Sequence, residues 1–220
     1  MSITNYIVDH IPKTTPYKRR PGIALTPQYI TIHSTANLTS TAKNERDWLV
    51  NKNNTVTASW HIAVDENQAV EAIPLNEVAY HAGTKAGNNS SIGIEICESG
   101  DRQKTLQNAA QLVAKLLKER GWGVDKLRRH YDWSGKICPR IFYDNGKWTG
   151  WDEFKKAVQN ELVGGGNMPN TQNNQPSSWA KEAWEWAKKE GITDGTAPQR
   201  TATREEVITM LYRCFKKVGK

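Results

Sequence analysis

The chain has 220 residues, of which 37% are hydrophobic and 24% charged, and its formal net charge is +7; this composition is typical of a soluble globular protein. Its three cysteines are too few for a disulfide-stabilised scaffold, and no segment approaches the roughly 18 apolar residues of a membrane span. The positive charge forms no basic block, so it suits a polyanionic partner, either nucleic acid or an anionic cell wall, without distinguishing between them.

Strand-like and helix-like segments alternate along the first part of the chain. The strand-like segments combine β-branched residues with period-two spacing, whereas the helix-like ones repeat apolar residues at i, i+3, i+4 and i+7. This alternation predicts an α/β fold, with a mixed central β-sheet flanked by helices. In chain order, we expect a strand at 29–37, a helix at 40–52, strands at 59–65 and 91–99, a helix at 103–120, a strand at 127–133 and a helix at 151–163.

Two of the predicted strands carry polar side chains at positions that alternate with apolar ones. Ile30 and Ile32 should face one side of the first strand, which leaves His33 on the other side. In the 91–99 strand, Glu95 lies opposite a stripe of isoleucines. The apolar faces predict where the core lies, and the polar faces predict where candidate functional side chains lie.

A linker at 163–177 divides the chain into two domains. This segment is rich in Gly, Asn, Gln and Pro, which bury little surface, so we interpret it as flexible. The domains on either side are then residues 1–162 and residues 178–220.

The second domain is predicted to be a small all-α module, a helical hairpin. Gly191 should end its first helix, and Thr203 followed by Glu206 fits a capping box at the start of the second. About 40 residues bury little core alone, so we expect this module to form a homodimer, to pack on the first domain or to repeat in an assembly. The apolar stripes comprise Ala180, Ala183, Trp184 and Ala187 in the first helix, and Val207, Met210, Leu211, Cys214 and Phe215 in the second.

A histidine and a cysteine within residues 128–140 (RRHYDWSGKICPR) carry the strongest chemical signal. His130 and Cys138 are both good Zn²⁺ ligands, but their spacing is not that of a zinc finger and no CxxC motif is present. A catalytic zinc site needs only three protein ligands, and His33 is the natural third. Two other interpretations stay open: these residues are structural, or Cys138 is a nucleophile with His130 or His33 as its base.

Such a zinc site also needs a base and a partner for a developing oxyanion. Glu95 lies within an apolar strand, where it is either a solvent-facing residue or a general base that deprotonates water. Lys136, two residues before Cys138, is either a surface lysine or a group that stabilises negative charge in the transition state.

Several motifs occur together in an ordered set. The chain contains, in this order, YITIHSTAN, ASWHIAVDENQAVEAIP, YHAG, NNSSIGIEI and RRHYDWSGKICP. From about residue 28 to residue 160 it thereby resembles the type-2 N-acetylmuramoyl-L-alanine amidases. That family includes phage endolysins, Bacillus-type autolysins and peptidoglycan recognition proteins. The resemblance implies a mixed sheet with helices packed on it, and hydrolysis of the amide between the lactyl group of N-acetylmuramic acid and the L-alanine of the peptide stem.

The resemblance also implies roles for individual residues. It assigns the Zn²⁺ ligands to His33, His130 and Cys138, the catalytic acid/base to Glu95 and an assisting role to Lys136. Recognition-only members of the family lack the zinc cysteine. Cys138 is present at that position in this chain, which favours an enzyme over a binding module.

Three further residues match positions that face the substrate in the family. His61 and His81 correspond to residues that line the substrate groove. Trp60 stands where many members have a catalytic tyrosine. Because tryptophan has no phenolic proton, any step that the tyrosine performs is absent here or is carried out by Glu95.

The C-terminal domain carries a resemblance of its own. It contains a WA…A…W…A helix, a GITDGT turn and a TREE start to the next helix, and so resembles one S-layer-homology-like module. The resemblance implies binding to an anionic secondary wall polymer or to peptidoglycan. A small helical dimerisation unit is the alternative.

The residues and the resemblances together predict a zinc amidase that acts on peptidoglycan, without a nucleic-acid or membrane partner. The N-terminus lacks the apolar core of a signal peptide, so we expect a phage endolysin that is made in the host cytoplasm and reaches the wall of a Gram-positive host through a holin pore. The alternative is a non-catalytic peptidoglycan-binding protein.

Overall fold

The computed structural model describes residues 5–164, 176, 180–193 and 204–218. The chain divides into two units, residues 1–166 and 167–220. Within the described ranges, every helix is too short or too polar to cross a lipid bilayer. The elements of the first unit are β1 (Tyr6–Val8), η1 (Pro16–Lys18), β2 (Tyr29–Ser34), α1 (Ala42–Val50), β3 (Ile62–Val64), β4 (Ala69–Glu71), α2 (Lys85–Asn88), β5 (Ser91–Ile96), α3 (Arg102–Glu119), η2 (Val124–Lys126), β6 (Leu127–Arg129), α4 (His130–Ser134), η3 (Arg140–Phe142) and α5 (Thr149–Gly164).

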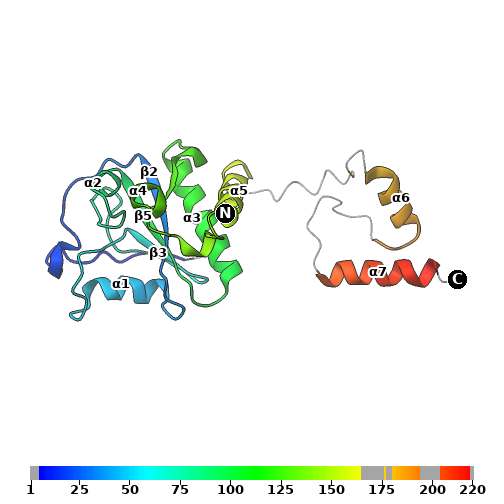
Figure 1. Ribbon diagram of the computed structural model, residues 1–220, viewed down its shortest axis with the longest axis horizontal. Coiled ribbons are helices and arrows are strands. Elements are labelled where there is room, and N and C mark those ends of the chain that lie inside the picture. Colours follow the sequence, from blue (N-terminus) through cyan, green and yellow to red (C-terminus); the bar gives the residue numbers. More distant parts are fainter. Residues whose placement is uncertain (1–4, 165–175, 177–179, 194–203, 219–220) are drawn as a thin grey trace. The chain divides into compact units, whose positions relative to one another are not determined.

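The six strands form one mixed sheet in the order β1-β4-β3-β5-β2-β6 (Figure 1). β3 and β4 pair antiparallel, whereas β2 pairs parallel with both β5 and β6, and β3 pairs parallel with β5. The mixed α/β architecture predicted from the sequence is therefore confirmed. The parallel strands β2, β5 and β6 all end at the same edge of the sheet, which is where open α/β sheets bind ligands.

The two faces of the sheet are covered by different helices. The long helices α3 and α5 lie together against the face that carries the isoleucines of β2 and β5, and this layer forms the main core (Figure 1). The N-cap Asp101 starts α3 by accepting hydrogen bonds from the backbone N–H groups of Gln103 and Lys104. Helix α1 packs on the opposite face through Ala42 and Leu49. That second face carries the polar residues of β2 and β5.

The strand expected at 127–133 is wrong over its second half. β6 ends at Arg129, and α4 begins at His130. The backbone N–H of Arg129 donates to Asp132 Oδ2 at 2.7 Å, so a local capping interaction starts a helix where the strand was expected to continue. The short strands β1 and β4 were not predicted, because three residues carry too little pattern.

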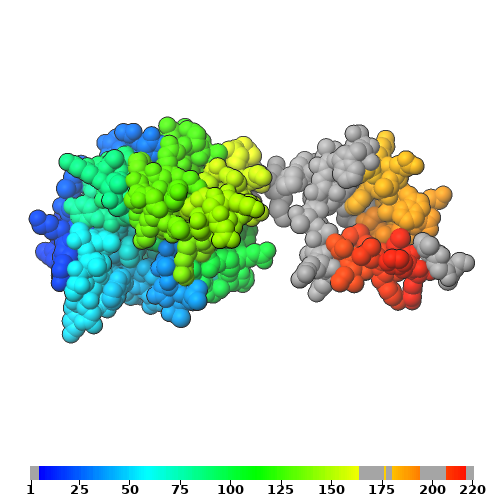
Figure 2. Space-filling view, viewed as in Figure 1, coloured from blue at the N-terminus to red at the C-terminus, as the bar shows by residue number. Residues whose placement is uncertain are grey.

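The second unit contains helices α6 (Lys181–Lys189) and α7 (Arg204–Val218). Gly191 follows α6 with a positive φ of 64°, as expected of a helix stop. Helix α7 is red in Figure 2. Its predicted apolar stripe lies largely on the surface, since Leu211 is 51% and Phe215 is 74% exposed. Thr203 of the proposed capping box lies outside the described residues, as does most of the predicted 163–177 linker, of which the first two residues complete α5.

Candidate metal centre

The register of the sheet brings a histidine and a glutamate together. His33 of β2 pairs with Glu95 of β5, one residue before the end of each strand. Paired residues on adjacent parallel strands point to the same side of the sheet. The His33 Nδ1 and Glu95 Oε1 atoms are 3.9 Å apart, on the face opposite the isoleucine core.

Helix α4 carries the second histidine of the cluster, His130. His130 is its first residue and follows β6, the strand beside β2. Trp133 fixes the helix against the sheet, because its indole Nε1–H donates to Thr31 Oγ1 at 2.8 Å and its ring packs edge-on against Tyr29. The side chain of His130 is therefore held over the end of β2, next to His33.

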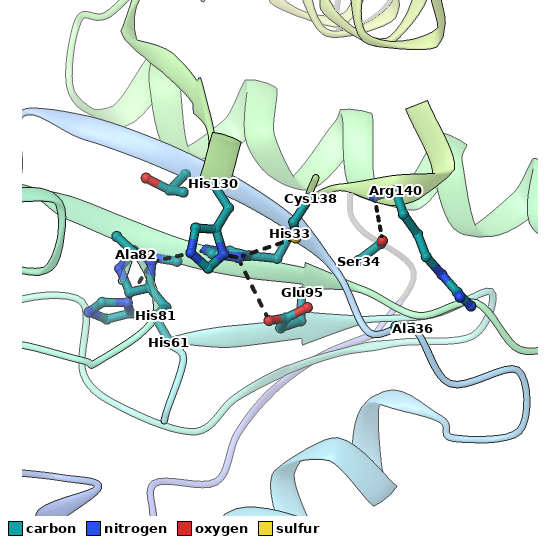
Figure 3. A network of polar contacts seen from close by, with 12 residues as sticks. His33, Ser34, Ala36, His61, His81, Ala82, Glu95, His130, Cys138 and Arg140 are labelled. Carbon is teal, nitrogen blue, oxygen red and sulfur yellow. Dashed lines mark hydrogen bonds and ion pairs between the residues drawn. The ribbon is translucent and has the colours of Figure 1, made fainter. Parts of the chain in front are cut away.

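The three residues predicted to hold a metal converge (Figure 3). His130 Nδ1 lies 3.1 Å from His33 Nδ1, and Cys138 Sγ lies 3.7 Å from the same atom. All three side chains are buried, and their donor atoms lie within 4.8 Å of one another. Among the described residues, these three form the one group of histidine, cysteine or acidic side chains whose geometry could hold a metal ion.

Burial keeps these three groups in their neutral forms. It lowers the pKa of His33 well below the usual histidine value, and it lowers the pKa of His130 to about 4, with a smaller contribution from the charge of Lys136. Burial, reinforced by the neighbouring Glu95, raises the pKa of the Cys138 thiol to about 12. Neutral imidazoles present the lone pairs that a metal ion needs. A nucleophile and a metal ligand both need the thiolate, so this shift of the thiol pKa alone favours neither interpretation of Cys138.

Glu95 lies beside this cluster, and Lys136 lines the same cavity. Burial, followed by the charge of Glu45, raises the pKa of Glu95 to about 8, against the opposing effect of Lys136. Glu95 Oε2 is buried and, among the described residues, lacks a hydrogen-bond partner. An unpartnered buried carboxylate oxygen is costly. It marks an atom available to a ligand, to water or to substrate.

The cluster forms the floor of a cavity of about 360 Å³. Trp60, His81 and Lys136 line it. His61 does not line it, contrary to the expectation from the motifs. Its ring is fully buried, and both of its nitrogens are bonded to the backbone: Nδ1 accepts a hydrogen bond from the Gly93 N–H at 2.9 Å, and Nε2 donates to the Glu77 carbonyl at 2.8 Å.

An ion pair at the rim was not found by reasoning from the sequence. The Arg140 guanidinium lines the cavity and donates to the Glu98 carboxylate at 2.7 and 2.9 Å. Glu98 also accepts from the Ala36 backbone N–H, and the Arg140 backbone N–H donates to Ser34 Oγ. These contacts tie the loop that carries Cys138 to the ends of β2 and β5. The partners are 42 residues apart, so no local spacing reveals them.

Comparison with known proteins identifies the family. The profile described as N-acetylmuramoyl-L-alanine amidase (Amidase_2) matches residues 24–141, which is more than half of the chain. The chain belongs to the N-acetylmuramoyl-L-alanine amidase family. This confirms the family predicted from the motifs.

The relatives of this amidase-family chain are longer than the part they share with it. It is 44% identical over 149 residues to the amidase XlyB of Bacillus subtilis (strain 168), covering 64% of this chain and 45% of XlyB. It is 44% identical over 151 residues to CwlA of the same organism, covering 66% of this chain and 53% of CwlA. The chain thus spans about half the length of the curated relatives it matches.

Two solved structures are similar to the first unit. The catalytic domain of XlyA aligns with a TM-score of 0.62 and 41% identity over 70% of this chain and 99% of that domain. The catalytic domain of PlyG aligns with a TM-score of 0.62 and 33% identity over 72% of this chain and 96% of that domain.

The donor set of this amidase-family chain fits a zinc ion. Two imidazole nitrogens and one sulfur are the ligand types that Zn²⁺ prefers, and three protein ligands leave a coordination position open, as in catalytic zinc sites. The orphaned Glu95 Oε2 lies beside the set, where a base is needed. The residues present therefore suit a catalytic zinc rather than a closed structural one.

Proposed function

We propose that the protein is a zinc-dependent N-acetylmuramoyl-L-alanine amidase, which hydrolyses the amide between the lactyl group of N-acetylmuramic acid and L-alanine in peptidoglycan. The observation that carries the proposal is the converged set of His33, His130 and Cys138 beside the unpartnered carboxylate of Glu95. The set lies in a cavity of a chain whose family model is that of these amidases.

His33 Nδ1, His130 Nδ1 and Cys138 Sγ would hold the ion. When bound, Zn²⁺ supplies Lewis acidity, which polarises an amide carbonyl and makes water a better nucleophile at neutral pH. The protein holds these donors within a buried pocket, so that the two imidazoles are neutral before any ion arrives.

Glu95 performs the proton transfers. Its Oε2 atom accepts a proton from the attacking water, and the same atom returns a proton to the leaving amine of L-alanine. The buried position favours this role, because a carboxylate whose pKa is raised toward neutrality both accepts and donates a proton readily. Lys136 places its positive charge in the same cavity, where it stabilises the oxyanion of the tetrahedral intermediate.

The biological setting is proposed to be bacterial lysis. The chain would act as a phage endolysin that reaches the wall of a Gram-positive host through a holin pore. The second unit would bind peptidoglycan or an anionic secondary wall polymer as an S-layer-homology-like module, and its exposed α7 stripe is suited to a homodimer contact.

Product analysis tests the chemistry. Purified protein should release new L-alanine amino termini from Gram-positive walls and no reducing sugar ends, and a strong chelator followed by added Zn²⁺ should abolish and then restore this release. Glu95→Gln should lower turnover by about 10²–10⁴-fold with an unchanged zinc content. Glu119→Gln, which changes an exposed carboxylate on α3, is the matched control and should be fully active.

A non-catalytic peptidoglycan-binding protein remains the competing function, and the same assay separates the two. If protein that carries stoichiometric zinc binds walls but releases no amino termini, the chain is a binding module and not an amidase. Release of reducing ends would instead indicate a glycosidase.

A further inference from the structure

The ring of His81 is held between a metal-ligand candidate and the backbone of the sheet. His81 Nδ1 lies 3.0 Å from His33 Nε2 (Figure 3). His81 Nε2 lies 3.1 Å from the Ser91 carbonyl oxygen. Both nitrogens of His81 are therefore engaged by the protein itself. A ring in this position has no nitrogen left to contact a substrate.

The chemistry of these partners fixes the direction of each hydrogen bond. A backbone carbonyl only accepts, so His81 Nε2 carries the proton and donates to Ser91. In a neutral ring, Nδ1 of His81 is then an acceptor, and it accepts a hydrogen bond from the Nε2–H group of His33. His33 is left with a free lone pair on Nδ1, the atom that faces His130 and Cys138.

We propose that His81 is a positioning residue, which selects the Nε2–H tautomer of His33 and aims the Nδ1 lone pair of His33 at the metal. This inference rests on the proposed zinc function of His33. In metal sites, a ligating histidine commonly donates its second ring N–H to a protein acceptor, which fixes both the tautomer and the ring orientation. Here the acceptor is another histidine, itself oriented by the backbone of β5.

The surroundings of His81 hold the ring against the sheet. Asn88 Oδ1 accepts hydrogen bonds from the backbone N–H groups of both His81 and Ala82. The ring packs on Gly93 of β5, where an added Cβ would lie 2.5 Å from His81 Cγ and 2.8 Å from His81 Nδ1. Only a glycine at position 93 therefore leaves room for the ring to reach His33.

His61 provides the contrast within the same chain. Its ring centroid lies 5.7 Å from that of His81, but its nitrogens contact the backbone groups of Gly93 and Glu77 and no metal-ligand candidate. The two histidines are neighbours of similar burial, and they differ in their contact with His33. A substitution at position 61 therefore measures the cost of disturbing this part of the core without changing the tautomer of His33.

The experiment combines zinc affinity with the tautomer of His33 in the full chain. Affinity is measured by competition with a chromophoric chelator, and the tautomer of the metal-free protein is read from long-range ¹H–¹⁵N spectra of its imidazoles. His81→Ala should weaken Zn²⁺ binding by roughly 10–100-fold and leave His33 in a mixture of tautomers. Gly93→Ala should act in the same direction by displacing the ring. His81→Asn, whose amide oxygen sits near the position of Nδ1, should recover part of the affinity.

The control and the contrary outcomes are clear. His61→Gln should lower stability while leaving the zinc affinity and the His33 tautomer unchanged. The positioning role is overturned if the wild-type protein shows His33 as the Nδ1–H tautomer, a result that needs no variant to fold, or if folded His81→Ala binds Zn²⁺ as tightly as the wild type. Failure of the wild type to bind zinc would instead overturn the proposed function, and the tautomer spectra would still decide the hydrogen-bond direction.

Discussion

Arg19 offers a direct test of how the loop that leads to Trp60, which lines the cavity, is held. Its side chain is fully buried, and its guanidinium donates to the carbonyl oxygens of Leu49, Asn54 and Val56. The Leu49 carbonyl belongs to the last turn of α1, where the helix dipole favours a positive charge. Among the described residues Arg19 forms no ion pair, so its buried charge is compensated by the three carbonyls and by the ring of Tyr17, whose centroid lies 5.0 Å from the guanidinium carbon. The loop that they fix runs directly into Trp60.

Replacing Arg19 by methionine should destabilise the first unit by about 3–5 kcal/mol, because three carbonyls lose a charged donor at once, and two of these hydrogen bonds are buried. The loss is smaller than three separate charge-assisted hydrogen bonds would suggest, since the cost of burying the charge also disappears. Arg19→Lys should recover about half of the loss, because an ammonium cannot match the fork of the guanidinium to all three acceptors. Lys18→Met, at the exposed neighbouring position, should change stability by less than about 0.5 kcal/mol.

Urea unfolding followed by tryptophan fluorescence measures these differences, with unchanged slopes expected for all variants. Hydrogen exchange should also show faster exchange in the 51–57 loop of Arg19→Met. If Arg19→Met unfolds within about 1 kcal/mol of the wild type, the three hydrogen bonds do not organise this loop, and the reasoning is wrong.

Two further predictions concern the support of the site and the fold. Trp133→Phe removes the 2.8 Å hydrogen bond to Thr31 that holds α4. The variant should bind Zn²⁺ about tenfold more weakly, as measured by chelator competition, and its free energy of unfolding should fall by about 1 kcal/mol. An unchanged zinc affinity would show that α4 does not need this hydrogen bond. Glu77→Gln should lower stability by about 1 kcal/mol at pH 7. The hydrogen bonds from Arg20 lower the pKa of Glu77, so this stabilisation is fully present above the unfolded-state pKa of 4.5 and is lost as the pH falls through the folded-state pKa. The unfolding free energies of the wild type and the variant should therefore converge at low pH. A difference that stays constant with pH would contradict this.

The pattern of β2 and β5 was predictable because strand side chains alternate strictly. Ile30 and Ile32 enter the core and His33 faces away from it, as period-two spacing requires. The pairing of His33 with Glu95 was not predictable, since register between strands more than 60 residues apart depends on the packing of the whole sheet. Motif resemblance supplied what spacing alone left open, namely that these residues share one site.

His61 and His81, which the motifs both placed in the substrate groove, show where motif reasoning ends. His61 and His81 occupy similar positions in the pattern, yet the first turns into the core and the second reaches His33. The difference comes from backbone groups of Gly93 and Ser91, which have no side-chain signature in the sequence. His130 is a comparable case, because the helix that carries it depends on the cap formed by Asp132.

The coordination of the metal tests the central claim most directly. X-ray absorption spectroscopy at the zinc edge, on the full chain loaded with one equivalent of Zn²⁺, should show one sulfur ligand at about 2.3 Å together with nitrogen or oxygen ligands at about 2.0–2.1 Å. The sulfur contribution should vanish in Cys138→Ser. A spectrum without sulfur in the wild type, or one that Cys138→Ser leaves unchanged, would contradict a site built from His33, His130 and Cys138.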